Sequence, residues 1–241
     1  MGRGLFITLE GIDGTGKSTQ LRLLAQHLKK RGLTVRVTRE PGGTGVGERI
    51  RKILLASSTR RLSPLAELVL MYAARAQHLE EVIRPSLERG EIVLSDRYND
   101  ASLAYQGYGR KLGVETVRAF DRVICGDTQP DLTLLLDLPP RLSLLRARAR
   151  QSRRNSKQER FERQGVEFHR RVRRGYLEIA RLEPQRVKLV RAGGAVAEIQ
   201  AQIRKLVDNF LAGRRKRPLT HPATAGDNVG AVHPLPKGEG W

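Results

Sequence analysis

Residues Gly11, Gly16, Lys17 and Ser18 fit the pattern G-x-x-x-x-G-K-[ST]. In this pattern the backbone N–H groups of a glycine-rich turn point at phosphate oxygens, and the following helix adds positive potential at its N-terminus. Lys17 is expected to face the outer phosphates of a nucleoside triphosphate, and Ser18 to offer its hydroxyl to Mg²⁺. The predicted ATP-binding residues are Gly11, Ile12, Asp13, Gly14, Thr15, Gly16, Lys17, Ser18 and Thr19.

The flanks of this motif predict a strand before the turn and a helix after it. Residues 5–9 are apolar and rich in strand formers, whereas Leu21, Leu24 and Leu28 recur at helical spacing. Further strands are predicted at 33–38, 91–95, 131–138 and 186–190, and helices at about 64–89, 113–124 and 195–211. The alternation predicts an α/β fold of the P-loop NTPase type, a three-layer sandwich with a mostly parallel five-stranded sheet and helices on both faces. Ligands are expected at the C-terminal ends of the strands.

The 241 residues suffice for one domain, and the single cysteine, Cys125, allows no intramolecular disulfide. Cys125 is expected to be a small buried filler. The N-terminus lacks a signal-peptide core, and the chain contains no apolar run long enough to span a membrane. These features predict a soluble cytoplasmic protein with no membrane partner.

The formal net charge of +20 raises the question of a polyanionic partner. Between residues 146 and 163 there are eight basic and two acidic residues, yet Phe161 is the only aromatic among them. A nucleic-acid binder more often interleaves aromatics for stacking, so we expect no specific nucleic acid. The domain prediction is one P-loop domain over 1–212, with a basic lid at about 147–162, followed by a disordered tail over 213–241.

Six motifs together make the chain resemble the thymidylate kinase family, from about Phe6 to Leu211. They are EGIDGTGKST, TREPGGT, LMYAARAQH, SDRYNDASLAYQG, PDLTLLLDL and the pair RARAR and ERFE. The resemblance implies an ATP-dependent phosphotransferase that moves the γ-phosphoryl group of MgATP to dTMP, giving dTDP for dTTP synthesis. It also implies a homodimer.

Two arginines at predicted strand ends suit an acceptor that is already an anion. Such a site must hold two repelling phosphates in line rather than remove a proton. The resemblance implies that Arg39 and Arg97 grip the phosphate of dTMP, with Arg97 also catalytic. Asp96 is expected to organise Mg²⁺ beside Ser18, directly or through water, and Asp13 to lie near the acceptor sugar and the metal.

The expected base and sugar site lies on the helix from residue 64 and the loop after residue 95. Arg75 resembles the family arginine that bonds a thymine carbonyl, and its planar donor fork suits that task. Met71 stands where the family has a stacking phenylalanine, so either Met71 or a neighbouring aromatic, Tyr72, is expected on the ring. The remaining predicted substrate residues are Ser102, Tyr105 and Gln106, with Tyr105 filling the place of a ribose 2′-hydroxyl.

The variable P-loop positions contain no cation, so transition-state charge must be met from elsewhere. We expect an arginine from a mobile lid loop between Arg148 and Arg154 to supply it. Arg150 and Arg153 are preferred over Arg148 and Arg154, and with Lys17 and Arg97 they form the predicted catalytic set. Glu159 stands where the family has an aspartate.

Two alternatives remain open at this stage. The chain could phosphorylate another nucleoside monophosphate, since a thymine methyl is worth only about 1–3 kcal/mol in a pocket. It could instead be a P-loop NTPase that uses its basic segments to bind nucleic acid.

Overall fold

The computed structural model describes residues 3–56, 62–154, 161 and 164–215. Its centre is a five-stranded sheet in the order β2-β3-β1-β4-β5, with every neighbouring pair parallel. The strands are β1 (Leu5–Glu10), β2 (Val35–Arg39), β3 (Ile92–Asp96), β4 (Leu132–Asp137) and β5 (Val187–Arg191). The predicted α/β class and parallel sheet are confirmed.

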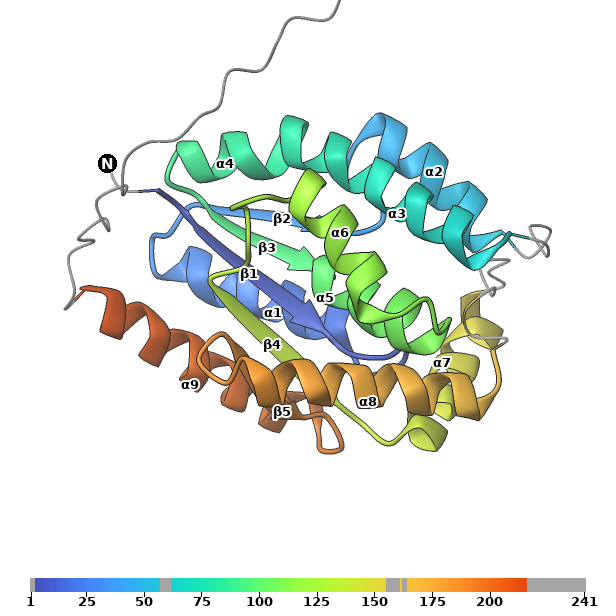
Figure 1. Cartoon of the computed structure of the whole chain (residues 1–241). Coiled ribbons are helices and arrows are strands. Elements are labelled where there is room, and N and C mark those ends of the chain that lie inside the picture. Colours follow the sequence, from blue (N-terminus) through green and yellow to red (C-terminus); the bar gives the residue numbers. More distant parts are fainter. Residues whose placement is uncertain (1–2, 57–61, 155–160, 162–163, 216–241) are drawn as a thin grey trace, which may run out of the picture.

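Helices cover both faces of this sheet (Figure 1). On one face, Ile7 and Leu9 of β1 pack in one hydrophobic cluster with α1 (Lys17–Lys30) and α9 (Val196–Arg215). On the other, Phe6 packs with Leu68 and Tyr72 of α3 (Pro64–His78) and with Val117 of α6 (Val114–Ile124). The period of two along a strand sends neighbouring side chains to opposite layers. A third cluster joins β4 and β5 to α8 (Val166–Leu182).

The predicted helix at 64–89 is confirmed as a nearly continuous helical run, although its hydrogen bonding changes along it. After α3 comes the π-helical segment η1 (Leu79–Ile83) and then α4 (Arg84–Glu88). A second π-helical segment, η2 (Leu103–Gly109), follows the short α5 (Asn99–Ser102). Periodicity alone does not distinguish a short π-helical segment from α-helix, because its hydrogen bonds span only one residue more.

Helix α2 (Gly45–Leu55) was not among the helices predicted from the sequence. Its start is fixed by Thr44, whose hydroxyl accepts a hydrogen bond from Gly47 N at 2.9 Å. This cap compensates for the low helix propensity of the glycines in the first turn.

The prediction of a mobile loop between Arg148 and Arg154 is wrong, because α7 (Pro140–Arg154) runs through it as helix. Its sequence has no glycine, and alanine, arginine and glutamine are strong helix formers. Helix α9 likewise extends to Arg215, past the predicted end. The rest of the predicted lid, except Phe161, and the tail from 216 lie outside the described residues. Among the described helices, none is long and apolar enough to cross a bilayer.

Candidate active site

A cavity of about 500 Å³ lies at the carboxyl edge of the sheet. The turns after β1, β2 and β3 all open into it, because parallel neighbouring strands end at the same edge. Most of the predicted site residues line it: Asp13, Gly14, Gly16, Lys17, Ser18, Thr19, Arg39, Met71, Arg75, Asp96, Arg97, Ser102, Tyr105 and Gln106. Gly11, Ile12 and Thr15 belong to the same P-loop but do not line the cavity.

The P-loop wraps closely against β4. Gly11 has φ of 135°, and a Cβ there would lie 2.4 Å from Leu136 O, so only glycine fits. Lys17 Nζ donates to the carbonyl oxygens of Gly11 and Ile12, both at 3.0 Å. Burial, reinforced by the nearby Arg97, lowers the pKa of the Lys17 ammonium to about 8. Added negative charge, such as a phosphate chain, would favour its charged form.

Ser18 and Asp96 meet at the mouth of the cavity. Ser18 Oγ donates to Asp96 Oδ2 at 2.6 Å, because β1 and β3 are adjacent and the P-loop folds back over the end of β3. Hydroxyl and carboxylate oxygens are the ligands that Mg²⁺ takes when it also bonds nucleotide phosphates. Within the described part of the chain no group of three or more His, Cys, Asp or Glu residues is placed to hold a metal. The pair therefore suits a metal that arrives with phosphate.

Arg97 is held in a backbone conformation that is unusual for its type, with φ of 76°. Its N–H donates to Leu9 O at 3.1 Å, and Ser95 Oγ donates to its carbonyl at 2.7 Å. These bonds compensate for the steric cost of left-handed backbone at a residue with a side chain. The conformation directs the guanidinium back over the P-loop.

The guanidinium of Arg97 contacts four groups from three parts of the chain. Nη1 donates to Gly11 O at 2.9 Å and to Tyr176 Oη at 3.0 Å, whereas Nη2 donates to Asp13 Oδ1 at 2.8 Å and to Tyr105 Oη at 3.0 Å. The carbon of the guanidinium also lies 4.7 Å from the centre of the Tyr105 ring. The predicted Asp13, Arg97 and Tyr105 are thus one connected group.

Asp13 is a carboxylate throughout the neutral range. Burial alone would raise its pKa, but Arg97 and Lys17 outweigh that effect, and the pKa lies well below its usual value. Tyr105 Oη adds a hydrogen bond to Oδ2 at 3.0 Å. A carboxylate so paired orients its partners rather than accepting a proton.

Two further arginines line the cavity beyond β2. Arg39 is half-exposed and forms an ion pair with Glu48 at 2.9 Å, so its guanidinium has a carboxylate partner while facing the cavity. Arg51, which the sequence reasoning missed, donates to Pro41 O at 2.7 Å and is partly buried. Burial and the neighbouring Arg39 lower the pKa of Arg51. With Lys17 and Arg97 they make a cavity wall suited to several anionic groups.

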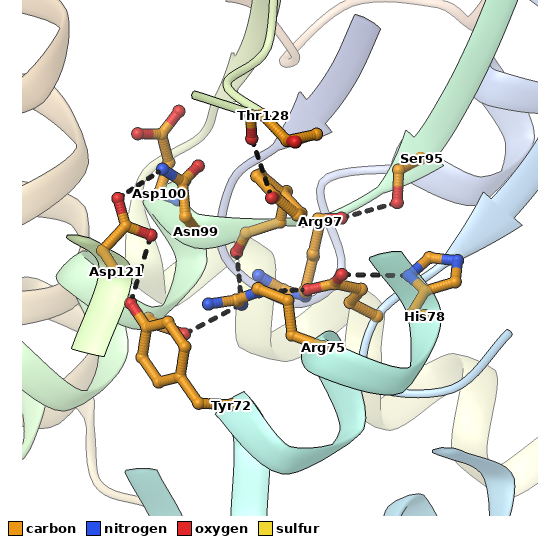
Figure 2. A network of polar contacts seen from close by, with 12 residues as sticks. Tyr72, Arg75, His78, Ser95, Arg97, Asn99, Asp100, Asp121 and Thr128 are labelled. Carbon is orange, nitrogen blue, oxygen red and sulfur yellow. Dashed lines mark hydrogen bonds and ion pairs between the residues drawn. The ribbon is translucent and has the colours of Figure 1, made fainter. Parts of the chain in front are cut away.

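Arg75 is fixed by a buried polar network (Figure 2). Its Nε donates to Glu40 Oε2 at 2.7 Å, and His78 Nδ1 lies 3.0 Å from the other oxygen of that carboxylate. Its Nη2 donates to Tyr98 O and to Ser102 Oγ, both at 3.0 Å. The remaining Nη1 is the only buried side-chain atom without a hydrogen-bond partner in the described residues. Arg75 therefore keeps an unused donor beside the cavity.

The two side chains left open for contact with the base, Met71 and Tyr72, have different surroundings. Met71 lines the cavity and packs against the cluster that contains Tyr105 and Phe161. Tyr72 is fully buried, with its ring stacked 5.6 Å from that of Phe120, and does not line the cavity. Of the two, only Met71 borders the cavity, and Phe161 borders it as well.

Sequence reasoning missed several residues around this cavity. Arg51 was overlooked because it belongs to helix α2, which was not predicted, and Glu40 because its partners, Arg75 and His78, are on α3. Tyr176 comes from α8, far along the chain. Glu10 is fully buried and accepts hydrogen bonds from Tyr98 N at 2.7 Å and Tyr176 Oη at 2.8 Å. A glutamate inside an apolar strand was the available signal, because buried carboxylates need partners.

Arg150 and Arg153 are placed by the structure only as positions on α7, and their side chains lie outside the described residues. Glu159 also lies outside them.

The sequence model of the thymidylate kinase family matches residues 9–203. Thymidylate kinase from Syntrophotalea carbinolica is 50% identical over 207 residues, which cover 86% of this chain and 96% of that protein. Thymidylate kinase from Pseudomonas syringae pv. tomato is 50% identical over 208 residues, covering 86% and 97%. The crystal structure of thymidylate kinase from Ehrlichia chaffeensis superposes with a TM-score of 0.69 at 31% identity, covering 86% and 99%.

Proposed function

Because this chain belongs to the thymidylate kinase family, it is an ATP-dependent dTMP kinase, and we propose that the cavity at the sheet edge carries out the transfer. The supporting observation is the convergence in one cavity of a P-loop, a hydroxyl–carboxylate pair and four arginines from four separate parts of the chain. This arrangement can hold two phosphorylated nucleotides in line, which is most of what phosphoryl transfer requires of a protein.

The P-loop and Lys17 bind the phosphates of ATP. Ser18 and Asp96 would hold Mg²⁺, whose oxygen-ligand preference they match. When bound, the ion neutralises charge on the β- and γ-phosphates. Lys17 then releases the carbonyls of Gly11 and Ile12 and bonds phosphate oxygens instead.

Arg97, Arg39 and Arg51 bind the phosphate of dTMP. Asp13 and Tyr105 hold Arg97 in position before the acceptor arrives, so little side-chain entropy is lost when the phosphate binds. Arg97 stays charged beside the incoming anion and stabilises charge on the moving phosphoryl group. Arg150 and Arg153 of α7 add positive charge to this shell.

The base and sugar of dTMP lie against the other wall of the cavity. Arg75 and Ser102 face a thymine carbonyl, Met71 packs on the ring, and Gln106 borders it. Tyr105 is fixed through its hydroxyl to Asp13, so its ring is a rigid wall where a ribose would carry its 2′-hydroxyl. That bulk favours deoxynucleotides.

The assay that tests this function measures ADP release with dTMP, dUMP, UMP and dGMP as acceptors, and then with single-stranded DNA. We expect the highest kcat/KM with dTMP and no stimulation by DNA. A higher kcat/KM with another monophosphate would show that this other monophosphate is the preferred acceptor. Stimulation by DNA alone would support a nucleic-acid-dependent NTPase.

We infer that the enzyme acts as a cytoplasmic homodimer with a single kinase domain, which includes α9 up to Arg215. Exposed apolar side chains on α2 and α3 support an association face: Ile53, Leu65 and Val69 are 48%, 50% and 44% exposed. Sedimentation of the full chain checks the stoichiometry.

A further inference from the structure

A fully buried carboxylate, Glu67 of α3, stands directly behind the cavity residue Gln106. Glu67 Oε1 accepts a hydrogen bond from Gln106 Nε2 at 2.8 Å. The same carboxylate accepts from Arg110 Nε at 3.2 Å and from Arg110 Nη2 at 3.0 Å. Glu67 is therefore paired in charge and, through Gln106, linked to the cavity wall.

These contacts determine which way the Gln106 amide faces. A carboxylate bound to an arginine only accepts hydrogen bonds, so the NH₂ group of Gln106 must face Glu67. The reversed amide would place its carbonyl oxygen against the carboxylate, an unpaired and repulsive contact in a buried site. Gln106 Oε1 is thereby left as an acceptor, and no bond to it is present within the described residues.

A hydrogen-bond donor, from Arg75, lies on the same wall of the cavity as the Gln106 acceptor. Ser102 and Gln106 are four residues apart in the helical run from α5 into η2, so their side chains leave nearly the same side. Arg75 is bonded to Ser102 Oγ at 3.0 Å and keeps an unused N–H donor. This wall therefore offers a donor from Arg75 and, about one helical turn along, an acceptor from Gln106.

We propose that Glu67 is a positioning residue that sets the base specificity of the site by fixing the amide of Gln106. A pyrimidine with a carbonyl at position 4 and N3–H presents an acceptor beside a donor, which complements Arg75 and Gln106 Oε1. A 4-aminopyrimidine presents the reverse pattern and leaves both protein groups unpaired. The inference rests on the proposed function, because it assumes that the base of the acceptor occupies this wall.

The test compares kcat/KM for dTMP and for dCMP in wild-type enzyme and in Glu67→Gln. A glutamine at 67 can both donate and accept, so Gln106 is free to rotate its amide. We expect the dTMP-to-dCMP ratio to fall by about tenfold, with the KM for ATP unchanged. The matched control is Glu115→Gln, which removes a carboxylate from the exposed surface of α6, where Glu115 pairs with Arg118, and should leave the ratio unaltered.

Glu67→Gln leaves Arg110 beside a neutral partner and can destabilise the fold. Glu67→Gln combined with Arg110→Gln removes both charges, so no buried charge stays unpaired. The double variant should show the same loss of discrimination. Equal losses for dTMP and dCMP, or an unchanged ratio in a folded variant, would overturn the role of Glu67. Failure of the wild-type enzyme to phosphorylate dTMP would instead overturn the proposed function.

Discussion

Arg97 Nη2 lies 2.8 Å from Asp13 Oδ1, which joins the residue after β3 to the centre of the P-loop. Tyr105 bonds to both partners, so the phosphate-binding arginine, the P-loop and the expected sugar wall form one unit. A displacement of any one of the three shifts the other two. Substitutions of Tyr105 must therefore separate the effect of its ring volume from the effect of its hydrogen bonds to Asp13 and Arg97.

Tyr105→Ala tests the sugar wall. Removing the ring opens space for a 2′-hydroxyl, so the ratio of kcat/KM for UMP to that for dUMP should rise by about tenfold. Tyr105→Phe keeps the ring but loses the bonds to Asp13 and Arg97. It should leave the ratio unchanged while lowering kcat, and an equal rise in both variants would show that bulk is not the cause.

Arg75→Ala tests the base site. The lost contact concerns only the acceptor, so the KM for dTMP should rise at least about tenfold while that for ATP stays constant. Removing Arg75 also leaves Glu40 buried with one partner fewer, and we expect a loss of about 3–5 kcal/mol in the free energy of unfolding. The kinetic constants of Arg75→Ala should therefore be measured on protein that circular dichroism has confirmed to be folded.

Arg118→Ala is the matched control, because Arg118 forms an exposed ion pair on α6 away from the cavity. It should change neither KM. If Arg75→Ala raises both Michaelis constants equally, Arg75 supports the fold and the base lies elsewhere.

The elements with strong local signals were predictable from the sequence. The P-loop lies between an apolar strand and a periodic helix, and the strands after it are short apolar runs. Because the strands are parallel, residues at their ends meet, and this rule brought Arg39, Asp96 and Arg97 to one edge of the sheet. The strand order alone therefore predicts that these three residues lie at the same edge of the sheet.

What was missed depends on contacts between distant segments. Tyr176 reaches Glu10 across 166 positions, and no local pattern records such a pair. Arg51 was missed because helix α2 was not predicted. The glycines near Thr44 have low helix propensity, although Thr44 itself is a capping signal. The helical course of α7 was misjudged because the lid expected from the family resemblance was given more weight than the helix propensity of alanine and arginine.

Glu10→Gln tests the buried carboxyl beneath the cavity through the pH dependence of stability. Burial, and after it the charge of Asp100, raises the pKa of Glu10 from 4.5 to about 8. Its folded pKa is above its unfolded value, so its stabilising contribution is full below pH 4.5 and is lost as pH rises toward 8. Relative to wild type, the variant should therefore gain stability with rising pH, by on the order of 5 kcal/mol across this window.

Urea unfolding of both proteins at pH 5 and pH 8 measures this difference. A difference between variant and wild type that is the same at both pH values would show that Glu10 keeps an ordinary pKa in the folded protein.

Asp96→Asn tests the metal site. The amide retains the shape of the carboxylate but loses its charge, so the Mg²⁺ concentration for half-maximal rate should rise about 10–100-fold. Chelation of Mg²⁺ should abolish activity in wild type and variant alike. The control Asp127→Asn, at an exposed position after α6, should keep the wild-type Mg²⁺ dependence. An unchanged dependence in Asp96→Asn would place the metal elsewhere.

The most direct test of phosphoryl transfer at this cavity is to follow dTDP and ADP together in a reaction of ATP with dTMP, for wild-type enzyme and for Arg97→Ala. We expect one dTDP for each ADP in wild type and a fall of at least about 100-fold in kcat in the variant, because Arg97 stabilises the transferring phosphoryl group. ADP formed without dTDP, or transfer by Arg97→Ala at the wild-type rate, would contradict this expectation.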